Sequence, residues 1–349
     1  MKFKEYLTMQ LERHPWTQPE DIVKLCYQSA YGAEHLLNDR NKAKAYFYSE
    51  YASASNANIV LYEPISPDVC RVNLSAWKKS GMPPEWLFCM FAASSSMPYG
   101  GKERLEQHLS EAEETLSSVS LHFSYSKWKN FLSQYHAQGM PAVHHSPVYR
   151  EKEHPSYRII HSVFLRLFPI LQKAASLASK NRPHILSIEG RSASGKTTMA
   201  EQLRQILGAS IIHMDDFFLP LELRTQRRLL EPGGNVHYER FLKEVLPSLS
   251  KPEPFSYRIF DCGRMNYNGV QEVEASQWRI VEGAYSCHPK FGDYSDLMVF
   301  SDVSSQEQEK RILARNGEKM AERFRNCWIP LEEAYFTHHQ IKERCQLII

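Results

Sequence analysis

Residues 190–198 constrain the fold of this chain more than any other segment. They read Gly-Arg-Ser-Ala-Ser-Gly-Lys-Thr-Thr, a complete G-x-x-x-x-G-K-[ST] phosphate loop. A short apolar run at 185–188 precedes the loop, and apolar residues at helical spacing follow it. In a strand–loop–helix context, backbone N–H groups converge on a phosphate and the helix dipole favours its charge. The segment therefore predicts a nucleotide-binding site.

The spacing of the loop assigns a task to each type of residue. Gly190 and Gly195 permit the tight backbone path. Lys196 is expected to reach the β- and γ-phosphates, and the Thr197 hydroxyl to bind Mg²⁺. The residues expected to hold the nucleotide are Gly190, Ser192, Ala193, Ser194, Gly195, Lys196, Thr197 and Thr198.

Composition excludes several classes of protein. The chain has 349 residues, a length that suggests two domains, with 42% hydrophobic and 23% charged residues, as in ordinary globular proteins. The formal net charge is +2 and the basic residues are scattered, so neither nucleic acid nor a membrane is expected as a partner. No apolar stretch approaches the roughly 18 residues of a membrane span, and the N-terminus lacks the pattern of a signal peptide. Seven cysteines without a C-x-x-C pair favour free thiols in a reducing cytoplasm.

The first half, residues 1–180, is predicted to be a mainly α-helical domain. Helical windows lie at 22–37, 84–93, 102–116, 125–138 and 158–178. Segments 53–60 and 64–70 are predicted as loops. Residues 175–183, rich in Ala, Ser, Lys and Asn, are the expected linker.

Residues 181–349 are predicted to form an α/β P-loop NTPase domain, with helices on both faces of a parallel sheet. Candidate strands lie at 185–188, 210–214, 279–281, 297–300 and 347–349, alternating with helices. Ligands in such folds bind at the carboxyl ends of the strands. Asp215 and Asp216 end the second candidate strand, and Glu282 ends the third.

These acidic residues suggest phosphoryl-transfer chemistry. A carboxylate at 215 would face the γ-phosphate and accept a proton from an attacking hydroxyl. The alternative is a pair of helix-capping aspartates. Glu282 resembles a Walker-B carboxylate that holds Mg²⁺ through water, and the alternative is an acidic strand end in solvent.

Two arginines stand one helical turn apart in the segment 309–315. Arg311 and Arg315 share a helix face and would clamp the transferring phosphoryl group when a lid closes. A charged, solvated helix is the alternative explanation. The preceding phosphate loop and Walker-B-like strand favour the lid.

Taken together, these motifs resemble the uridine kinase family, whose relatives include phosphoribulokinase and pantothenate kinase. The resemblance covers roughly residues 184–349 and rests on the loop, on Asp215-Asp216-Phe217-Phe218, on Glu282-Gly283 and on the arginine helix. It implies ATP- and Mg²⁺-dependent phosphorylation of a primary hydroxyl, the 5′-hydroxyl of a nucleoside in the central members. It places Asp215, Lys196, Arg311 and Arg315 in catalysis, and Thr197 and Glu282 at the metal.

The resemblance also implies an acceptor site, from which this sequence departs. The residues that correspond to this site are Asp215, Phe218, Asn235, Tyr257, Asp261 and Arg264. Asn235 stands where nucleoside kinases carry an aspartate, Phe260 replaces a tyrosine, and a histidine expected a few residues later is absent. Ile349 ends the last candidate strand, where relatives continue with residues that help to hold adenine. Acceptor and nucleotide donor preference thus stay open.

The first half carries a cluster of potential ligands but no recognised family. Residues 144–150 read His-His-Ser-Pro-Val-Tyr-Arg, residues 154–158 read His-Pro-Ser-Tyr-Arg, and Glu34-His35 lies in a separate helix. Three uses stay open: ordinary packing or a domain interface, an anion or substrate site, and a metal site.

The sequence thus predicts a cytoplasmic small-molecule kinase, most simply for a uridine- or cytidine-like nucleoside. The alternatives are a kinase for another small alcohol, such as pantothenate or a sugar acid, and a nucleotide-dependent regulatory or scaffold protein with little turnover. The expected partner is the small-molecule acceptor, and an oligomer is compatible with the sequence.

Overall fold

The computed structural model describes residues 2–33, 37, 39–55, 59–117 and 121–349. The chain forms two compact units, Met1–Arg166 and Leu167–Ile349. This boundary lies earlier than the expected one at 180/181, because helix α9 (Phe168–Ser176) packs against strand β9 (Leu297–Ser301) of the second unit. Each unit is described by itself.

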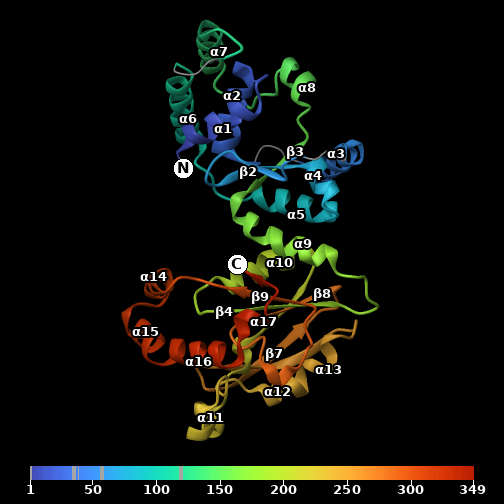
Figure 1. The fold of residues 1–349 in the computed structure, drawn as a ribbon, viewed down its shortest axis with the longest axis vertical. Coiled ribbons are helices and arrows are strands. Elements are labelled where there is room, and N and C mark those ends of the chain that lie inside the picture. Colours follow the sequence, from blue (N-terminus) through green and yellow to red (C-terminus); the bar gives the residue numbers. More distant parts are fainter. Residues whose placement is uncertain (1, 34–36, 38, 56–58, 118–120) are drawn as a thin grey trace. The chain divides into compact units, whose positions relative to one another are not determined.

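The first unit is mainly helical, as predicted, and also contains a small sheet (Figure 1). Its helices are α1 (Phe3–Arg13), α2 (Pro19–Tyr31), α3 (Arg40–Ser53), α4 (Leu74–Lys79), α5 (Pro84–Ser94), α6 (Gly101–Leu116), α7 (Tyr125–Ala137) and α8 (Pro147–Glu153). Side-chain caps begin several of them: Ser124 accepts from Lys127 N at 3.3 Å, and Ser146 accepts from Tyr149 N at 3.1 Å.

Strands β1 (Tyr62–Pro64), β2 (Val69–Asn73) and β3 (Tyr157–His161) form an antiparallel sheet in the order β1-β2-β3. The loop predicted at 64–70 is present at 65–68, but its first residue belongs to β1 and its last two to β2. The helix predicted from 158 was wrong at 158–161, which belong to β3. Both β2 and β3 are buried on successive residues, so neither shows the apolar–polar alternation that marks a half-exposed strand. After β3 the chain forms a 3₁₀ turn at Ser162–Leu167 before α9, and the predicted helix holds only in α9.

The second unit is built on a five-stranded sheet with every neighbouring pair parallel. Its strand order is β10 (Leu347–Ile348), β9, β4 (His184–Gly190), β8 (Trp278–Glu282) and β5 (Ser210–His213). All five predicted strands are confirmed. Apolar residues fill the interior of these strands because helices cover both faces of the sheet.

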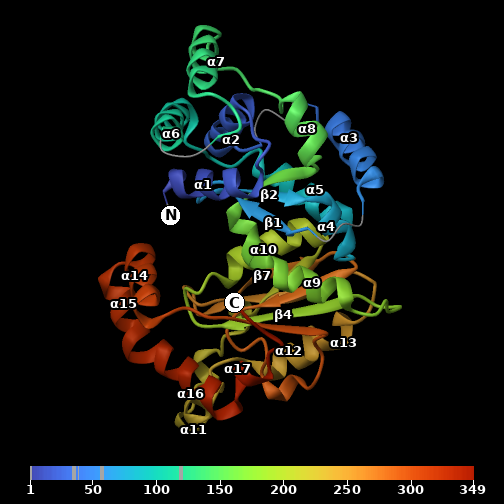
Figure 2. The same cartoon turned by 45° about the horizontal axis from the view of Figure 1, so that its top comes forward.

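The helices of this unit follow the strands along the chain. Those after the central strand are α10 (Lys196–Leu207), α11 (Gln226–Leu230), α12 (Tyr238–Glu244), α13 (Leu246–Leu249), α14 (Ser305–Asn316), α15 (Glu318–Arg323), α16 (Ile329–His339) and α17 (Ile341–Arg344). Figure 2 shows α9 and α10 on one face of the sheet and α12, α13 and α17 on the other. Buried residues such as Ile212, Phe241 and Val281 belong to the core between the sheet and this second layer.

A hairpin extends from the second unit, formed by β6 (Phe255–Asp261) and β7 (Asn266–Val273). It contains three of the predicted acceptor-site residues: Tyr257 and Asp261 on β6, and Arg264 in the turn. Within the described residues no helix has the length and apolarity needed to cross a membrane.

Candidate active site at the phosphate loop

The phosphate loop joins the end of β4 to the start of α10 through a backbone path that suits glycine. Gly190 has φ +139°, and a Cβ there would lie 2.1 Å from the carbonyl oxygen of Ser301 on β9. Gly195 has φ +97° and directly precedes the first residue of α10. The backbone conformation therefore favours glycine at both positions, and close packing against β9 also requires it at Gly190.

The Lys196 side chain lies over the loop itself. Its Nζ donates to the carbonyl oxygens of Gly190 at 2.7 Å and Arg191 at 2.9 Å. These neutral acceptors leave the charge of the ammonium uncompensated by a direct ion pair. The lysine is thus held at the loop as a cation available to an anionic ligand.

Thr197, Glu282 and His213 form a polar group at the carboxyl ends of the strands. The Thr197 hydroxyl lies 3.3 and 3.4 Å from the two carboxylate oxygens of Glu282, which is 5% exposed. His213 Nδ1 lies 2.6 Å from Glu282 Oε1. This hydrogen bond to the carboxylate raises the pKa of His213. Sequence reasoning had assigned His213 no role, and the register pair His213↔Glu282 explains why the two meet.

Asp215 and Asp216 follow β5 and differ in their surroundings. Asp216 accepts a hydrogen bond from the buried Tyr257 hydroxyl at 2.9 Å, and its backbone oxygen accepts from Arg240. Asp215 makes no hydrogen bond with any residue that the structure describes. The pKa of Asp215 is raised, chiefly because surrounding protein displaces water and next because the Glu282 carboxylate is near, while Lys196 acts in the opposite direction. Asp215 therefore has a free carboxylate with increased proton affinity.

The structure brings one of the two predicted lid arginines to the loop. Arg311 on α14 donates to the carbonyl oxygen of Ala193 at 3.2 Å and pairs with Glu307 at 2.9 Å. Arg315 donates to its neighbour Asn316 at 2.9 Å. Arg311 is thus held against the phosphate loop, whereas the contact of Arg315 is local to its own helix.

A carboxylate from α16 also contacts the loop, and sequence reasoning missed it. Glu332 accepts from the backbone N–H of Ser192 at 3.0 Å and from the Ser192 hydroxyl. Its neighbour Glu333 pairs with Arg191 at 2.6 Å, and Asp302 pairs with the same arginine. No spacing rule could have linked residues so far apart in the chain.

Glu189, the residue before Gly190, is a second missed carboxylate and is fully buried. It accepts hydrogen bonds from the backbone N–H groups of Gly190, Tyr285 and Cys287 at 2.9–3.0 Å, and from the Tyr335 hydroxyl at 3.1 Å. Four donors satisfy a charge that burial would otherwise penalise. Glu189 thereby ties the start of the phosphate loop to the segment after β8 and to α16.

The predicted acceptor-site residues are only partly brought together. Tyr257 contacts Asp216, as described, and Phe218 forms a backbone bridge with Val236, beside Asn235. Asp261 instead accepts from the backbone N–H groups of Gly263 at 2.8 Å and Arg264 at 3.2 Å in the turn of the β6–β7 hairpin. The Arg264 side chain is 73% exposed. Asp261 therefore stabilises the hairpin turn, and its predicted role in acceptor binding stays a prediction.

The candidate ligands of the first half bear on whether the chain has a metal site away from the phosphate loop. Among the described residues there is no group of three or more His, Cys, Asp or Glu that suits a metal ion. Glu34 and His35 lie outside the described residues. All seven cysteines are free thiols, as the sequence predicted.

The second unit has the predicted α/β P-loop NTPase fold: a parallel five-stranded sheet with helices on both faces and a phosphate loop after its central strand. No family profile matches the chain. Among solved structures, the chain is similar to a candidate uridine kinase from Bacillus stearothermophilus, with 18% identity, a TM-score of 0.43, and coverage of 54% of this chain and 99% of that one. It is also similar to a candidate fructose transport system kinase from Silicibacter sp. TM1040, with 21% identity, a TM-score of 0.44, and coverage of 53% and 97%.

Proposed function

We propose that the second unit is a small-molecule kinase that transfers a phosphoryl group from ATP to a hydroxyl group. The observation that carries this proposal is the place of Asp215 just after β5, on the same side of the sheet as the phosphate loop and Glu282, with no hydrogen bond to a residue that the structure describes. A nucleotide switch needs the loop and a metal ligand but has no use for an unpaired base beside them. This arrangement favours an enzyme over a regulatory or scaffold protein.

The residues present fit a nucleotide bound with Mg²⁺. The loop offers backbone N–H groups at the start of α10, and Lys196 offers a cation. Thr197 and Glu282 offer the hard oxygen ligands that Mg²⁺ prefers. When bound, Mg·ATP supplies the phosphoryl group that is transferred.

The chain's own residues then have distinct tasks. Asp215 accepts the proton from the acceptor hydroxyl as its oxygen attacks. Lys196 and Arg311 stabilise negative charge that develops on the phosphoryl oxygens. Arg315 joins them if α14 moves on ligand binding, as a lid does. Tyr257 holds Asp216 in place, so that Asp216 shapes the wall of the site.

Within this class, we propose a nucleoside of the uridine or cytidine type as the acceptor, with its primary hydroxyl as the attacking group. The sequence resemblance supports this choice, with Tyr257 and Phe218 on the acceptor side. Another small alcohol, such as pantothenate or a sugar acid, is the alternative. The engagement of Asp261 in the hairpin turn favours this alternative, because that carboxylate is already hydrogen bonded.

A coupled assay of ADP release over nucleosides, pantothenate and sugar acids tests the proposal. A kinase releases ADP faster when its acceptor is present, and this stimulation disappears in Asp215→Asn. A protein that binds ATP but shows no stimulation by any member of the panel would be a regulatory protein instead.

A further inference from the structure

A cavity of about 830 Å³ opens within the first unit, apart from the site proposed above. Residues of α2, α3, α8 and β3 line it, together with the segment before α8. Its volume lies in the range of about 300–1,000 Å³ typical of small-molecule sites. The cluster of histidines and arginines that the sequence left unassigned lies on its wall: His144, His145, Arg150, His154 and Arg158.

The wall of this cavity carries excess positive charge. Among the residues that the structure describes, the wall carries three cations, Lys24, Arg150 and Arg158, and one carboxylate, Glu50, a formal charge of +2. Arg158 pairs with Glu50 and is 8% exposed, so these two charges balance one another. The excess therefore resides on Lys24 and Arg150.

Neither of these two cations has an acidic partner among the described residues. Lys24 donates to the backbone oxygen of Val143 at 3.1 Å, and Arg150 is exposed on α8 without a hydrogen bond to the described part of the chain. Burial lowers the pKa of Lys24 to about 8, and the nearby charges of Arg71 and Arg150 contribute in the same direction, partly opposed by Asp21. The electrostatic potential at Lys24 is thus positive, and a bound anion would offset the repulsion between these cations.

Arg71 strengthens this field from behind the wall. It is buried, and its guanidinium donates to the side-chain oxygen of Gln28 at 2.7 and 3.1 Å and to that of Gln10 at 3.1 Å. These acceptors are neutral amides, which satisfy the hydrogen bonds of the guanidinium without neutralising its charge. A buried arginine bound in this way adds positive potential to the cavity beside Gln28.

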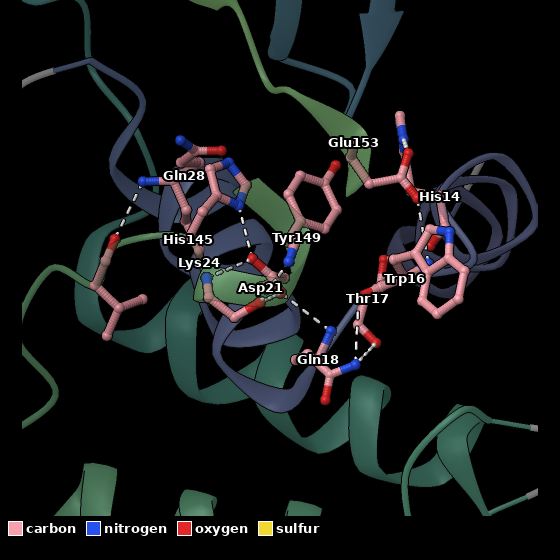
Figure 3. A network of polar contacts seen from close by, with 12 residues as sticks. His14, Trp16, Thr17, Gln18, Asp21, Lys24, Gln28, His145, Tyr149 and Glu153 are labelled. Carbon is pink, nitrogen blue, oxygen red and sulfur yellow. Dashed lines mark hydrogen bonds and ion pairs between the residues drawn. The ribbon is translucent and has the colours of Figure 1, made fainter. Parts of the chain in front are cut away.

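A chain of hydrogen bonds fixes the polar wall. Figure 3 shows the contact between His145 and Asp21. His145 Nδ1 lies 2.7 Å from Asp21 Oδ1, and His145 Nε2 lies 2.6 Å from the Tyr157 hydroxyl. Burial lowers the pKa of His145 to about 4, so the ring is neutral and carries one proton. The carboxylate of Asp21 requires that proton on Nδ1, so Nε2 accepts from Tyr157. Gln28 Nε2 donates to the same hydroxyl at 3.2 Å, and the wall is thereby preorganised.

We propose that this cavity binds a phosphorylated small molecule, with its phosphomonoester group held by Lys24 and Arg150. The excess charge of +2 complements a phosphomonoester dianion, whereas a single carboxylate would leave one cation uncompensated. Arginine presents a fork that matches phosphate oxygens and lysine a compact charge, a combination that suits phosphate. Tyr46, Phe91 and Ile159 supply apolar wall for the organic part of the ligand. This site does not depend on the proposed kinase activity.

Calorimetric titration of the full-length protein with ribose 5-phosphate tests the site. All variants carry Lys196→Ala, to weaken phosphate binding at the loop of the second unit. The test variant adds Lys24→Gln and Arg150→Gln. The matched control adds Lys102→Gln, an exposed lysine on α6 that is not part of the cavity wall. Thermal melting of each variant checks folding, and Arg150→Gln alone serves if the Lys24 substitution destabilises the unit.

We expect ribose 5-phosphate to bind about tenfold or more weakly to the double variant than to the control, since two charge-assisted contacts are lost. Unphosphorylated ribose should bind to neither. Equal affinity in test and control variants would overturn the proposal, as would binding of ribose as tight as that of its phosphate. Binding of the carboxylate ribonate in preference to ribose 5-phosphate would overturn the assignment to phosphate, and no binding at about 5 mM would overturn the site.

Discussion

Glu332 of α16 accepts two hydrogen bonds from Ser192 of the phosphate loop, one from its backbone N–H and one from its hydroxyl. The carboxylate thus makes, with a loop N–H, the kind of contact that a phosphate oxygen makes at such loops. Dehydration by the surrounding protein raises the pKa of Glu332, while Lys196 and Ser192 act in the opposite direction. An incoming triphosphate would meet this negative charge at the loop.

We therefore expect Glu332→Gln to bind ATP more tightly than the wild type, with a dissociation constant lowered about threefold to tenfold by the loss of charge repulsion. Glutamine keeps an oxygen that accepts from Ser192. Calorimetric titration with Mg·ATP measures the change. Glu333→Gln is the control, because Glu333 pairs with Arg191 and not with Ser192. Weaker binding by Glu332→Gln would show that its charge stabilises the loop for the nucleotide.

Lys196→Ala should lower phosphotransfer by about 10²–10³ in kcat, because the ammonium at the loop stabilises developing charge. The substitution should leave the fold intact, since the side chain contacts loop carbonyls and not the core. Lys251→Ala, at an exposed turn after α13, is the matched control. Phosphotransfer close to that of the control would contradict the assignment of the phosphate loop.

Asp215→Asn should lower kcat by about 10²–10⁴ and leave ATP binding nearly unchanged, because it removes the proton acceptor. Asp216→Asn should cost less activity and more thermal stability, because Asp216 accepts a hydrogen bond from buried Tyr257. Since the pKa of Asp215 is raised, kcat should fall on acidification at a higher pH than for an ordinary aspartate. If Asp216→Asn lowered kcat more than Asp215→Asn, Asp216 would be the proton acceptor instead.

Residues 167–349 should fold alone and bind Mg·ATP, because the phosphate loop, Asp215, Glu282 and Arg311 all lie in the second unit. A fragment that begins at residue 181 lacks α9, which buries Phe168, Ile170 and Leu171. Its melting temperature should therefore be lower than that of 167–349. Thermal melting with and without Mg·ATP distinguishes the fragments, and equal melting temperatures would show that α9 is dispensable.

Acid should destabilise the first unit through His108. This ring is buried, stacks on Phe3 at 3.9 Å and lies 2.7 Å from the Ser29 hydroxyl. Burial lowers its pKa from 6.5 to about 4. Between these pH values the ring is therefore mostly protonated in the unfolded chain and mostly neutral in the folded chain. The free energy of unfolding therefore falls as pH drops from 6.5 towards 4, with a contribution on the order of 2–3 kcal/mol.

His108→Phe keeps the stacking on Phe3 and removes this titration. Denaturant unfolding of residues 1–166 or of the full chain, at about pH 7.5 and about pH 4.5, measures the difference. The loss of stability on acidification should be smaller in the variant. An equal loss in both proteins would assign the acid sensitivity to other groups.

The parts of the second unit that sequence could predict are those with local signals. The residues of the phosphate loop have a fixed spacing in the sequence. The five parallel strands of the second unit are short apolar runs between helices. Asp215 lies just after β5 and Glu282 ends β8, as their positions beside such runs predict, while their roles stay predictions. By contrast, Glu189 and Glu332 reach the loop through tertiary contacts that no spacing rule contains. The β2–β3 pair was missed because burial on both faces removes the alternation that indicates a strand.

In the first unit, sequence could identify a cluster of polar residues but not its arrangement. His145 lies far along the chain from Asp21, and only the folded unit shows that the two share a hydrogen bond. Arg71 lies in β2, just after the segment 64–70 predicted as a loop, and no pattern in the sequence singles it out. The charge of the cavity depends on which cations lack acidic partners, and that depends on packing.

The pairing of β2 with β3 has a consequence for the order of events during synthesis. Val69 pairs with His161. The central strand β2 therefore cannot pair with β3 until a segment about ninety residues further along the chain has been synthesised. On the ribosome, the helices α4 to α8 are therefore made before the strand that closes the sheet. The first unit can complete its fold only when residue 161 has left the exit tunnel, when α9 is the next helix to emerge. Shortened products that end before Tyr157 would expose the edge of β2, and such open edges favour aggregation.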